Sequence, residues 1–303
     1  MPAAIAPPPV SSRHREVSAC LSCGSPRRQP LFIRDGFQFV TCTDCGLAYL
    51  RNPLTEEELC RFYSFASNYH AGFRTSESLR NQFLDRGRTY LRYLTRHRQQ
   101  GTLLDVGCSA GFFLKVAQDA GWQVQGLEFS PDSAELGRDL FSCDIQVGGL
   151  LNHELPAGSF DALTLWDVIE HLPEPLEEMR QAHDLLRPGG LVAISTPNIA
   201  GLFPQLSYQV AGLINYWTHI EPPAHLTQFS VSTLSELLRR AGFEIVSAST
   251  RRIPLDYSFG TLAELARMPK RLLYALAFAP AAAVGPWLGM GDEVVLIARR
   301  PLR

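Results

Sequence analysis

Four of the seven cysteines stand in two pairs that have the spacing of metal ligands. The stretch "CLSC" supplies Cys20 and Cys23, and the stretch "CTDC" supplies Cys42 and Cys45. Four thiolates brought together in this way bind one Zn²⁺ in tetrahedral geometry. A site with four protein ligands leaves no open position for a substrate, so we expect this zinc to be structural rather than catalytic.

The residues around the two pairs predict a small unit that depends on its metal. The stretch "PLFIRDGFQFVTC" alternates well enough for a β-hairpin, which makes residues 18–50 a zinc ribbon that needs zinc to fold. Gly24 and Gly46 follow the pairs and let the backbone turn under the metal without a Cβ clash. Two disulfides or four reduced core thiols are the alternatives, of which the first needs an oxidising compartment. We expect the remaining cysteines to be small buried residues: Cys60, Cys108 and Cys143.

A second group of residues is suited to hold a nucleoside. Asp105 ends a short apolar run, and Gly107 and Gly111 bracket the turn that follows it. Glu128 ends the next apolar run, where a carboxylate can accept hydrogen bonds from both ribose hydroxyls. The turn reads G-C-S-A-G, so the third glycine of the dinucleotide fingerprint is missing and no pyrophosphate is expected. No Gly-Lys-Ser/Thr follows, which excludes a Walker-type phosphate loop.

The elements that must position these residues alternate along the chain from residue 101. Expected strands cover 102–106, 123–128, 144–149, 160–168 and 190–197, and expected helices cover 111–120, 131–140 and 174–186. This alternation predicts a parallel α/β sheet with right-handed crossovers. Ligands of such sheets bind at the carboxyl ends of the strands, beside the switch in strand order, where we expect the first turn to lie.

Length and composition predict one large domain with an appendage. The chain has 303 residues, 46% of them hydrophobic, which suffices for a substantial core. Its formal net charge of −2 creates no general field for a polyanion, so nucleic acid is not an expected partner. The expected organisation is a disordered tail without a secretory signal (1–17), the ribbon (18–50), a helical linker or cap (51–100) and the α/β domain (101–303). We therefore expect a cytoplasmic location.

The stretch "DVGCSAG" (105–111) resembles the first motif, D-x-G-x-G-x-G, of the class I S-adenosylmethionine-dependent methyltransferases, with Ser109 at the middle glycine. The resemblance continues through "FDALTLWDVIEHLPEP" (160–175), "LLRPGG" (185–190), "ISTPN" (194–198) and "AHLTQFSVSTL" (224–234). It implies a Rossmann-like sheet, mostly parallel with an antiparallel last strand, and S-adenosylmethionine as the cofactor. By this resemblance the cofactor would contact Asp105, Gly107, Ser109 and Gly111 at its methionine end, Glu128 at the ribose, Phe129 at the adenine, and Asp167 and Val168 on a rim that reaches His171 beside the sulfonium.

The acceptor of the methyl group must be inferred from the candidate base. The stretch "WDVIEHL" replaces the Asn/Asp-Pro-Pro-aromatic signature for exocyclic amines, and a Pro-Cys nucleophile is absent, which disfavours nucleic-acid bases. Residues 200–230 are rich in Tyr, Trp and His and are expected to form a substrate lid. Our leading general base is His225, because an imidazole can accept a hydroxyl proton; His171 and His219 are the next candidates. Neighbours that could orient it or stack on an acceptor are Tyr216, Trp217, His219 and Glu221. In the alternative, His225 only holds the loop by hydrogen bonds.

These residues predict a methyltransferase that acts on oxygen of a small molecule. The arrangement of ribbon and domain looks like that of zinc-ribbon methyltransferases of sugars, nucleotide-linked sugars, other secondary metabolites and glycans. Two alternatives stay open. One is an RNA methyltransferase that grips phosphates with Arg86, Arg88, Arg92, Arg96 and Arg98. The other is a scaffold that has kept a cofactor pocket without catalysing methyl transfer.

An apolar insertion (253–291) precedes the expected last strand, "EVVLIAR". Within it, residues 272–290 have nearly the length of a membrane span, but Pro280 and Pro286 interrupt them, so we do not expect a full crossing. Burial as a helical hairpin and a homodimer interface are favoured. The third reading is a membrane-surface anchor at the inner membrane face, with Arg267, Lys270 and Arg271 toward the headgroups.

Overall fold

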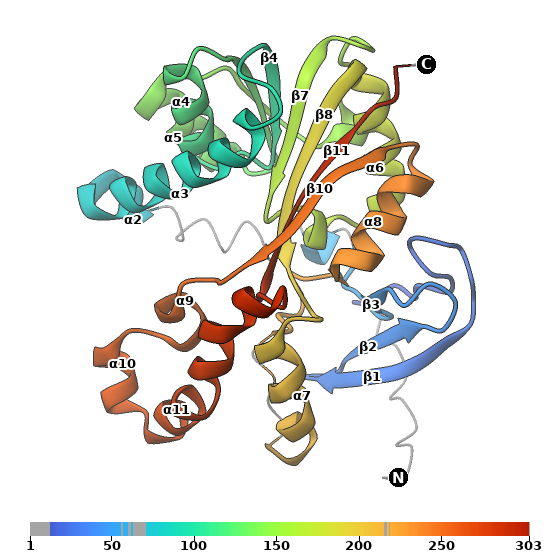
Figure 1. Cartoon of the computed structure of the whole chain (residues 1–303), viewed down its shortest axis with the longest axis vertical. Helices are drawn as coiled ribbons and strands as arrows, with labels where there is room; N and C mark the ends of the chain where they lie inside the picture. Colours follow the sequence, from blue (N-terminus) through green and yellow to red (C-terminus); the bar gives the residue numbers. More distant parts are fainter. Residues whose placement is uncertain are drawn as a thin grey trace. The chain divides into compact units, whose positions relative to one another are not determined.

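The computed structural model describes residues 13–55, 57–59, 62, 71–214, 217 and 219–302 (Figure 1). The chain divides into two compact units. We call the first the ribbon unit; it comprises Met1–Arg61, Pro197–Thr233 and Thr250–Glu293. We call the second the sheet unit; it comprises Phe62–Thr196, Leu234–Ser249 and Val294–Arg303.

The sheet unit is organised around a seven-stranded sheet with the order β10-β11-β8-β7-β4-β5-β6. Its strands are β4 (Thr102–Val106), β5 (Gln123–Glu128), β6 (Ile145–Val147), β7 (Phe160–Trp166), β8 (Leu186–Pro197), β10 (Glu244–Arg251) and β11 (Glu293–Arg299). The pairs formed by β4 to β8 are parallel. The last strand is antiparallel, because Arg300 at its end exchanges backbone hydrogen bonds with Gly189 and Gly190 near the start of β8. The expected Rossmann-like sheet with an antiparallel last strand is confirmed.

Helices cover both faces of this sheet. Figure 1 shows α3 (Glu77–Thr95), α4 (Phe112–Asp119) and α5 (Pro131–Phe141) on one side, and α6 (Pro175–Leu185) and α8 (Val231–Arg240) on the other. Shorter pieces are α2 (Ala71–Thr75), η2 (Leu150–Asn152) and η3 (Ile169–His171). The strands and helices expected between residues 101 and 197 are all present. The last of these strands is longer than expected, because β8 begins at Leu186 rather than at Gly190.

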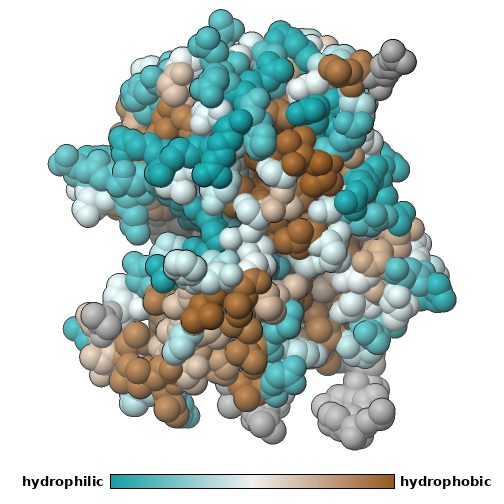
Figure 2. Space-filling model, in the orientation of Figure 1, coloured by the Kyte–Doolittle hydropathy of each residue, from teal (hydrophilic) through white to brown (hydrophobic). Residues whose placement is uncertain are grey.

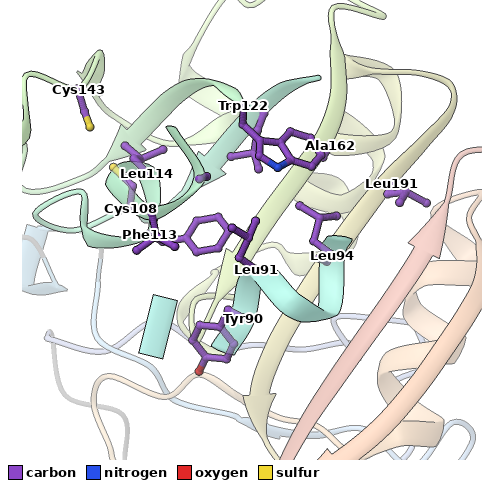
Figure 3. Packing of buried hydrophobic residues seen from close by; sticks show 14 of the residues in the cluster. Tyr90, Leu91, Leu94, Cys108, Phe113, Leu114, Trp122, Cys143, Ala162 and Leu191 are labelled. Carbon is purple, nitrogen blue, oxygen red and sulfur yellow. The ribbon is translucent and has the colours of Figure 1, made fainter. Parts of the chain in front are cut away.

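The core of the sheet unit forms where α3 packs against α4. Leu91 of α3 lies beside Phe113 of α4, as Figure 3 shows, and Tyr90, Leu94 and Leu114 belong to the same buried apolar cluster. This apolar packing anchors α3 to the domain, so the helical linker contributes to the core and does not merely lead into it. The structure bears out two cysteines as small buried residues, Cys108 and Cys143, whereas Cys60 lies outside the described residues.

The ribbon unit contains a second, smaller sheet with the order β1-β2-β3-β9. Its strands are β1 (Arg28–Arg34), β2 (Phe37–Cys42), β3 (Ala48–Leu50) and β9 (Thr227–Gln228). The expected hairpin of β1 and β2 is present. The ribbon is not confined to residues 18–50, however, because β9 comes from the expected lid and pairs with β3.

Part of the expected N-terminal tail belongs to the ordered ribbon unit. His14 forms an antiparallel bridge with Leu54, and the amide of Val17 donates to the carbonyl of Arg51. Residues 13–17 are therefore held as an extended segment rather than as a disordered tail. Residues 1–12 lie outside the described part of the chain.

The remaining helices of the ribbon unit pack around an apolar cluster. They are α7 (Leu202–Ile214), α9 (Leu255–Phe259), α10 (Leu262–Arg267), α11 (Pro269–Val284) and the 3₁₀ helix η4 (Gly285–Leu288). The buried members of the cluster are Phe203, Phe259, Leu265, Ala275 and Ala282. Among the described residues, the segment Pro269–Leu288 is long and apolar enough to cross a membrane, and only 22% of its most apolar window is buried. Simple burial as a hairpin is therefore wrong for the outer side of α11.

Candidate functional site

The four paired cysteines converge in the ribbon unit. The Sγ atoms of Cys20 and Cys45 lie 3.5 Å apart, and those of Cys23 and Cys42 lie 3.6 Å apart. All four Sγ atoms lie within 4.8 Å of one another. A tetrahedral zinc with Zn–S bonds of about 2.3 Å has sulfur–sulfur separations of about 3.8 Å, so this donor set fits Zn²⁺. The cysteines are free thiols, which contradicts the disulfide alternative.

The two cysteine pairs form the same backbone turn. The amide of Gly24 donates to the carbonyl of Cys20, and the amide of Gly46 donates to the carbonyl of Cys42. Both glycines are left-handed, with φ of 72° and 77°. A Cβ on Gly24 would meet nothing within 4 Å. The left-handed backbone therefore favours glycine at Gly24, where the protein atoms themselves leave room for a Cβ.

The turn after β4 lies at the switch point of the large sheet, since β5 and β7 flank β4 on opposite sides. Gly107 and Gly111 have φ of 68° and 73°, and Ser109 between them has φ of 51°. Ser109 therefore adopts the left-handed conformation that the family's glycine adopts at lower cost. A Cβ on Gly107 would lie 2.5 Å from Cγ2 of Val168, so Gly107 lets the loops after β4 and β7 meet.

Glu128 is fixed by two backbone amides at the end of β5. Its Oε2 accepts a hydrogen bond from the amide of Ser109, and its Oε1 accepts one from the amide of Ser130, each at 2.8 Å. Burial raises the pKa of this carboxyl. Each carboxylate oxygen can still accept a further hydrogen bond. The adjacent Phe129 is 50% exposed, so its ring is open to stacking on a planar ligand.

Asp105 is the most deeply buried of the predicted cofactor residues that carry a charge. It is 2% exposed, and its Oδ1 accepts a hydrogen bond from the hydroxyl of Thr164 at 2.6 Å. Burial raises its pKa to about 7, and the nearby charge of Glu128 acts in the same direction. A cationic amino group brought to Asp105 would favour its ionised form.

Asp167 is held in a strained backbone conformation, with φ of 57°, directly after β7. Its Oδ1 accepts a hydrogen bond from the hydroxyl of Ser195 at 2.9 Å, and its Oδ2 accepts one from the hydroxyl of Tyr90 at 2.9 Å. Arg86 forms an ion pair with the same Oδ2. Strain of this kind persists where the surroundings over-determine it, and it gathers at functional sites. The sequence did not indicate that Tyr90 and Ser195 contact Asp167, because nothing in their local sequence marks them. Arg86 was named only among the arginines that could bind phosphates in the RNA alternative.

The residues after Asp167 form the short helix η3. The amide of His171 donates a hydrogen bond to the carbonyl of Val168, and this bond closes the turn. The buried Glu170 accepts a hydrogen bond from the hydroxyl of Thr196 at 2.9 Å. In the sheet unit, the structure therefore gathers the loops after β4, β5 and β7 that carry the predicted cofactor residues; their roles stay predictions.

The leading base candidate, His225, lies in the ribbon unit and is buried. Its Nε2 lies 3.9 Å from Oε2 of Glu221, and its amide donates to the carbonyl of Glu221 at 2.9 Å. The side-chain separation is too long for a hydrogen bond, so Glu221 lies near the imidazole without fixing its orientation. Burial lowers the pKa of His219 to about 4, so this imidazole is neutral at pH 7.

Trp217 differs from its expected role in contacting an acceptor. It is 1% exposed, and its indole donates a hydrogen bond to the carbonyl of Pro204 at 3.2 Å. It packs in a cluster with Phe39 and Leu50 of the ribbon. Trp217 is therefore a core residue of the ribbon unit. Tyr216, the other expected aromatic neighbour, lies outside the described residues.

Comparison with known proteins places the chain in a family. The family described as Methyltransferase domain matches residues 77–248, which is more than half of the chain. A Mycolicibacterium smegmatis protein named "Probable S-adenosylmethionine-dependent methyltransferase" is 30% identical over 151 residues, covering 49% of this chain and 54% of that protein. The ubiquinone biosynthesis O-methyltransferase of Xanthomonas campestris is 35% identical over 103 residues, covering 32% of this chain and 43% of that enzyme. The match thus spans about half the length of these relatives.

Solved structures agree on the fold. A methyltransferase from Archaeoglobus fulgidus, described as dependent on S-adenosylmethionine, has a TM-score of 0.52 at 20% identity, covering 76% of this chain and 97% of that one. The cyclase SpnF has a TM-score of 0.51 at 23% identity, covering 72% of this chain and 81% of that one. At these identities the likeness shows the fold alone, and one fold serves several reactions. The motif order, the sheet and the family match together show that this chain belongs to the class I S-adenosylmethionine-dependent methyltransferases.

Proposed function

We propose that this chain transfers the methyl group of S-adenosylmethionine to an oxygen atom of a small-molecule or sugar-type acceptor. The observation that carries the proposal is the fixed carboxylate of Glu128 beside the exposed ring of Phe129, at the switch point of the sheet. This is the set of a hydrogen-bond acceptor for the ribose hydroxyls and a stacking ring for the base that a nucleoside needs. The name of the Xanthomonas relative, an O-methyltransferase, supports oxygen as the acceptor atom.

The chain's own residues fit S-adenosylmethionine chemically. Glu128 would accept hydrogen bonds from the ribose hydroxyls, and Phe129 would stack on the adenine. Asp105 would pair with the amino group, which favours the ionised carboxylate. The bound cofactor supplies an electrophilic methyl group on its sulfonium, and the protein must hold the acceptor oxygen in line with it.

His225 is the proposed general base. A hydroxyl is a weak nucleophile until a base removes its proton, and a buried imidazole with a carboxylate nearby is suited to this step. The pairing of His225 with Glu221 supports the role, because a carboxylate stabilises the imidazolium that forms. In this role His225 would take the proton of the acceptor's hydroxyl.

The ribbon cysteines are proposed to hold one structural Zn²⁺. Their mutual distances and the repeated backbone turn support zinc, and the closed set of four thiolates leaves no position for catalysis. The proposed metal would stabilise the fold of the ribbon unit rather than take part in methyl transfer.

The RNA alternative is weakened by the partners of the arginines. Arg88 pairs with Asp85, and Arg98 pairs with Asp161. Arg86 pairs with Asp167, as described above. Carboxylates therefore already neutralise three of the arginines that would have to grip phosphates.

Turnover with isotopically labelled S-adenosylmethionine tests the proposal. The intact chain would be incubated with phenols and quinols, nucleotide-linked sugars, oligosaccharides and structured RNA in separate reactions. We expect label in a methyl ether of one of the first three classes. Binding of S-adenosylhomocysteine without turnover on any class would favour the scaffold alternative. Label that enters RNA would contradict a small-molecule acceptor, and label on a nitrogen atom of any acceptor would contradict O-methylation.

A further inference from the structure

Apolar side chains form an exposed stripe on α11 and η4. They recur at helical spacing, and we call them the α11 face: Leu273, Leu276, Pro280, Val284 and Trp287. Leu273 is 71% exposed and Trp287 is 90% exposed. The opposite side of α11, with Ala275 and Ala282, packs in the apolar cluster of the ribbon unit. Figure 2 shows the hydrophobic side chains gathered over the region of α10 and α11.

This stripe differs from the scattered exposed leucines of an ordinary surface. Its members are contiguous along the helix, whereas Leu151 of the sheet unit is an exposed leucine outside this stripe. Contiguous exposed apolar surface marks a binding face. An indole that projects into solvent is also typical of a side chain that settles among lipid headgroups.

The charge around the stripe indicates the kind of partner. Residues 265–291 contain three basic residues and no acidic residue. The basic residues are Arg267, the last residue of α10, and Lys270 and Arg271 in the first turn of α11. The acidic residue that precedes them, Glu264, accepts hydrogen bonds from Thr261 in the cap of α10. The stripe is therefore apolar with a basic end, the pattern of helices that bind anionic membranes.

We infer that the α11 face docks on an anionic lipid surface, with α11 lying along the membrane. The inference holds whatever the methyl acceptor is. A crossing is excluded by connectivity: β10 precedes the insertion and β11 follows it, and these strands are neighbours in one sheet. Both ends of the insertion must therefore stay on the same side of the membrane.

A second copy of the chain fits this face less well. A two-fold contact through α11 would bring in the same segment, which contains no acidic residue to neutralise Arg267 or Lys270. Anionic headgroups neutralise both residues while the acyl region accepts the leucines and Trp287.

Vesicle flotation with the intact chain tests the inference. Vesicles of phosphatidylcholine alone and of phosphatidylcholine with phosphatidylglycerol would be compared at low and high salt. We expect flotation with the anionic vesicles at low salt and a loss at high salt, because the screening length falls from about 30 Å at 0.01 M to about 8 Å at 0.15 M. Equal binding to neutral vesicles would overturn the role of the basic residues.

Substitutions distinguish the contribution of the apolar side chains to membrane binding from that of the basic side chains. We expect Leu273→Ser with Leu276→Ser to lower partitioning about tenfold or more for each leucine. Arg267→Gln with Lys270→Gln should lower it about fivefold for each charge. Leu151→Ser is the matched control for an exposed leucine, and Arg88→Gln with Lys115→Gln is the control for the same change in net charge. Each variant must bind S-adenosylhomocysteine and must keep the metal content and the circular dichroism spectrum of the unchanged chain, which verifies the fold of both units.

Tryptophan fluorescence reports which residue enters the lipid. The other tryptophans are Trp122, Trp166 and Trp217, of which the first and last are buried and the second is half-buried. Brominated acyl chains should therefore quench Trp287 selectively, and Trp287→Phe should remove the quenching while flotation persists. An intact chain that stays in the soluble fraction with both vesicles at low salt would overturn the inference. A dimer that dissociates on substitution of Leu273 and Leu276, without flotation, would assign the face to a second copy instead.

Discussion

The two units of this protein are stabilised in different ways. The sheet unit has a continuous apolar core in which α3, α4 and the central strands pack together. The ribbon unit is assembled from three separate stretches of the chain around small apolar clusters and four thiols. A fold with its own core can keep a strained, polar site without further support, whereas a small unit commonly needs a metal. The predictions below test this contrast, starting from the largest expected effect.

Removal of zinc should unfold the ribbon sheet and leave the sheet unit intact. Chelation leaves four thiols without a shared ligand, so the free energy of metal binding is lost from folding. Hydrogen exchange should show lost protection of amides in β1, β2 and β3, with β4 and β7 unchanged. About one zinc per chain is expected by metal analysis of the untreated protein. A metal-free protein with a protected ribbon would contradict the prediction.

His225→Ala should lower the turnover rate by about 10²–10³-fold, because it removes the proposed base from the proton-transfer step. The affinity for S-adenosylhomocysteine should change less than about twofold, since the base acts on the acceptor. His97→Ala, an exposed histidine of the sheet unit, is the control. Steady-state kinetics with calorimetry gives both quantities. Wild-type turnover in His225→Ala would leave this histidine a structural role only.

Glu128→Ala should weaken S-adenosylhomocysteine binding about a hundredfold, because hydrogen bonds from a ligand to a charged group are worth about 1.5–3 kcal/mol each. Glu135→Gln on the exposed side of α5 is the control and should bind normally. Metal content should be the same in both variants, which shows that the two units respond separately. Unchanged affinity in Glu128→Ala, measured by calorimetry, would refute the ribose site.

The affinity for S-adenosylhomocysteine should rise with pH up to about 7 and then level off. Burial raises the pKa of Asp105 from 3.8 to about 7, and the amino group of the ligand needs the ionised carboxylate. Below that pKa the affinity should fall by up to about tenfold per pH unit. Methylthioadenosine lacks the amino group and serves as the control in calorimetry across pH. An equal pH dependence for both ligands would exclude Asp105 as the cause.

The raised pKa of Asp105 affects the stability of the ligand-free protein in the opposite direction. Stability should fall as the pH rises, whereas the affinity for the ligand should increase. The buried carboxyl is more easily protonated in the folded state than in the unfolded state, so its contribution is fully present below about pH 4. It is lost as the pH rises through about 7. Bound ligand should reduce this loss, because its amino group compensates the ionised Asp105.

Ser109→Gly should raise the free energy of unfolding by about 0.5–1 kcal/mol, because glycine adopts the left-handed backbone without the penalty that serine carries. Ser142→Gly is a matched control, since Ser142 is also left-handed, at the C-terminal cap of α5. Chemical denaturation should show a similar gain in both. A destabilised Ser109→Gly would mean that the serine side chain supports the turn.

Local sequence patterns determined the elements that hold the predicted chemistry. The cysteine spacing, the glycine turn between β4 and α4, and Glu128 at the end of β5 were all readable, because each depends on residues close together in the chain. The last strand, β11, was readable for the same reason: a short run of β-branched and apolar residues predicts a strand wherever it lies.

Only the tertiary structure decided which distant segments meet. The two-residue strand β9 has no local signal, and it exists because β3 offers it a hydrogen-bonding edge. Trp217 became a core residue because it packs with Phe39 and Leu50, far away in sequence. Asp167 found Arg86 and Tyr90 on a helix that precedes the sheet. The sequence also could not predict whether α11 is buried or exposed. An apolar helix is buried or exposed according to what packs against it and not according to its own composition.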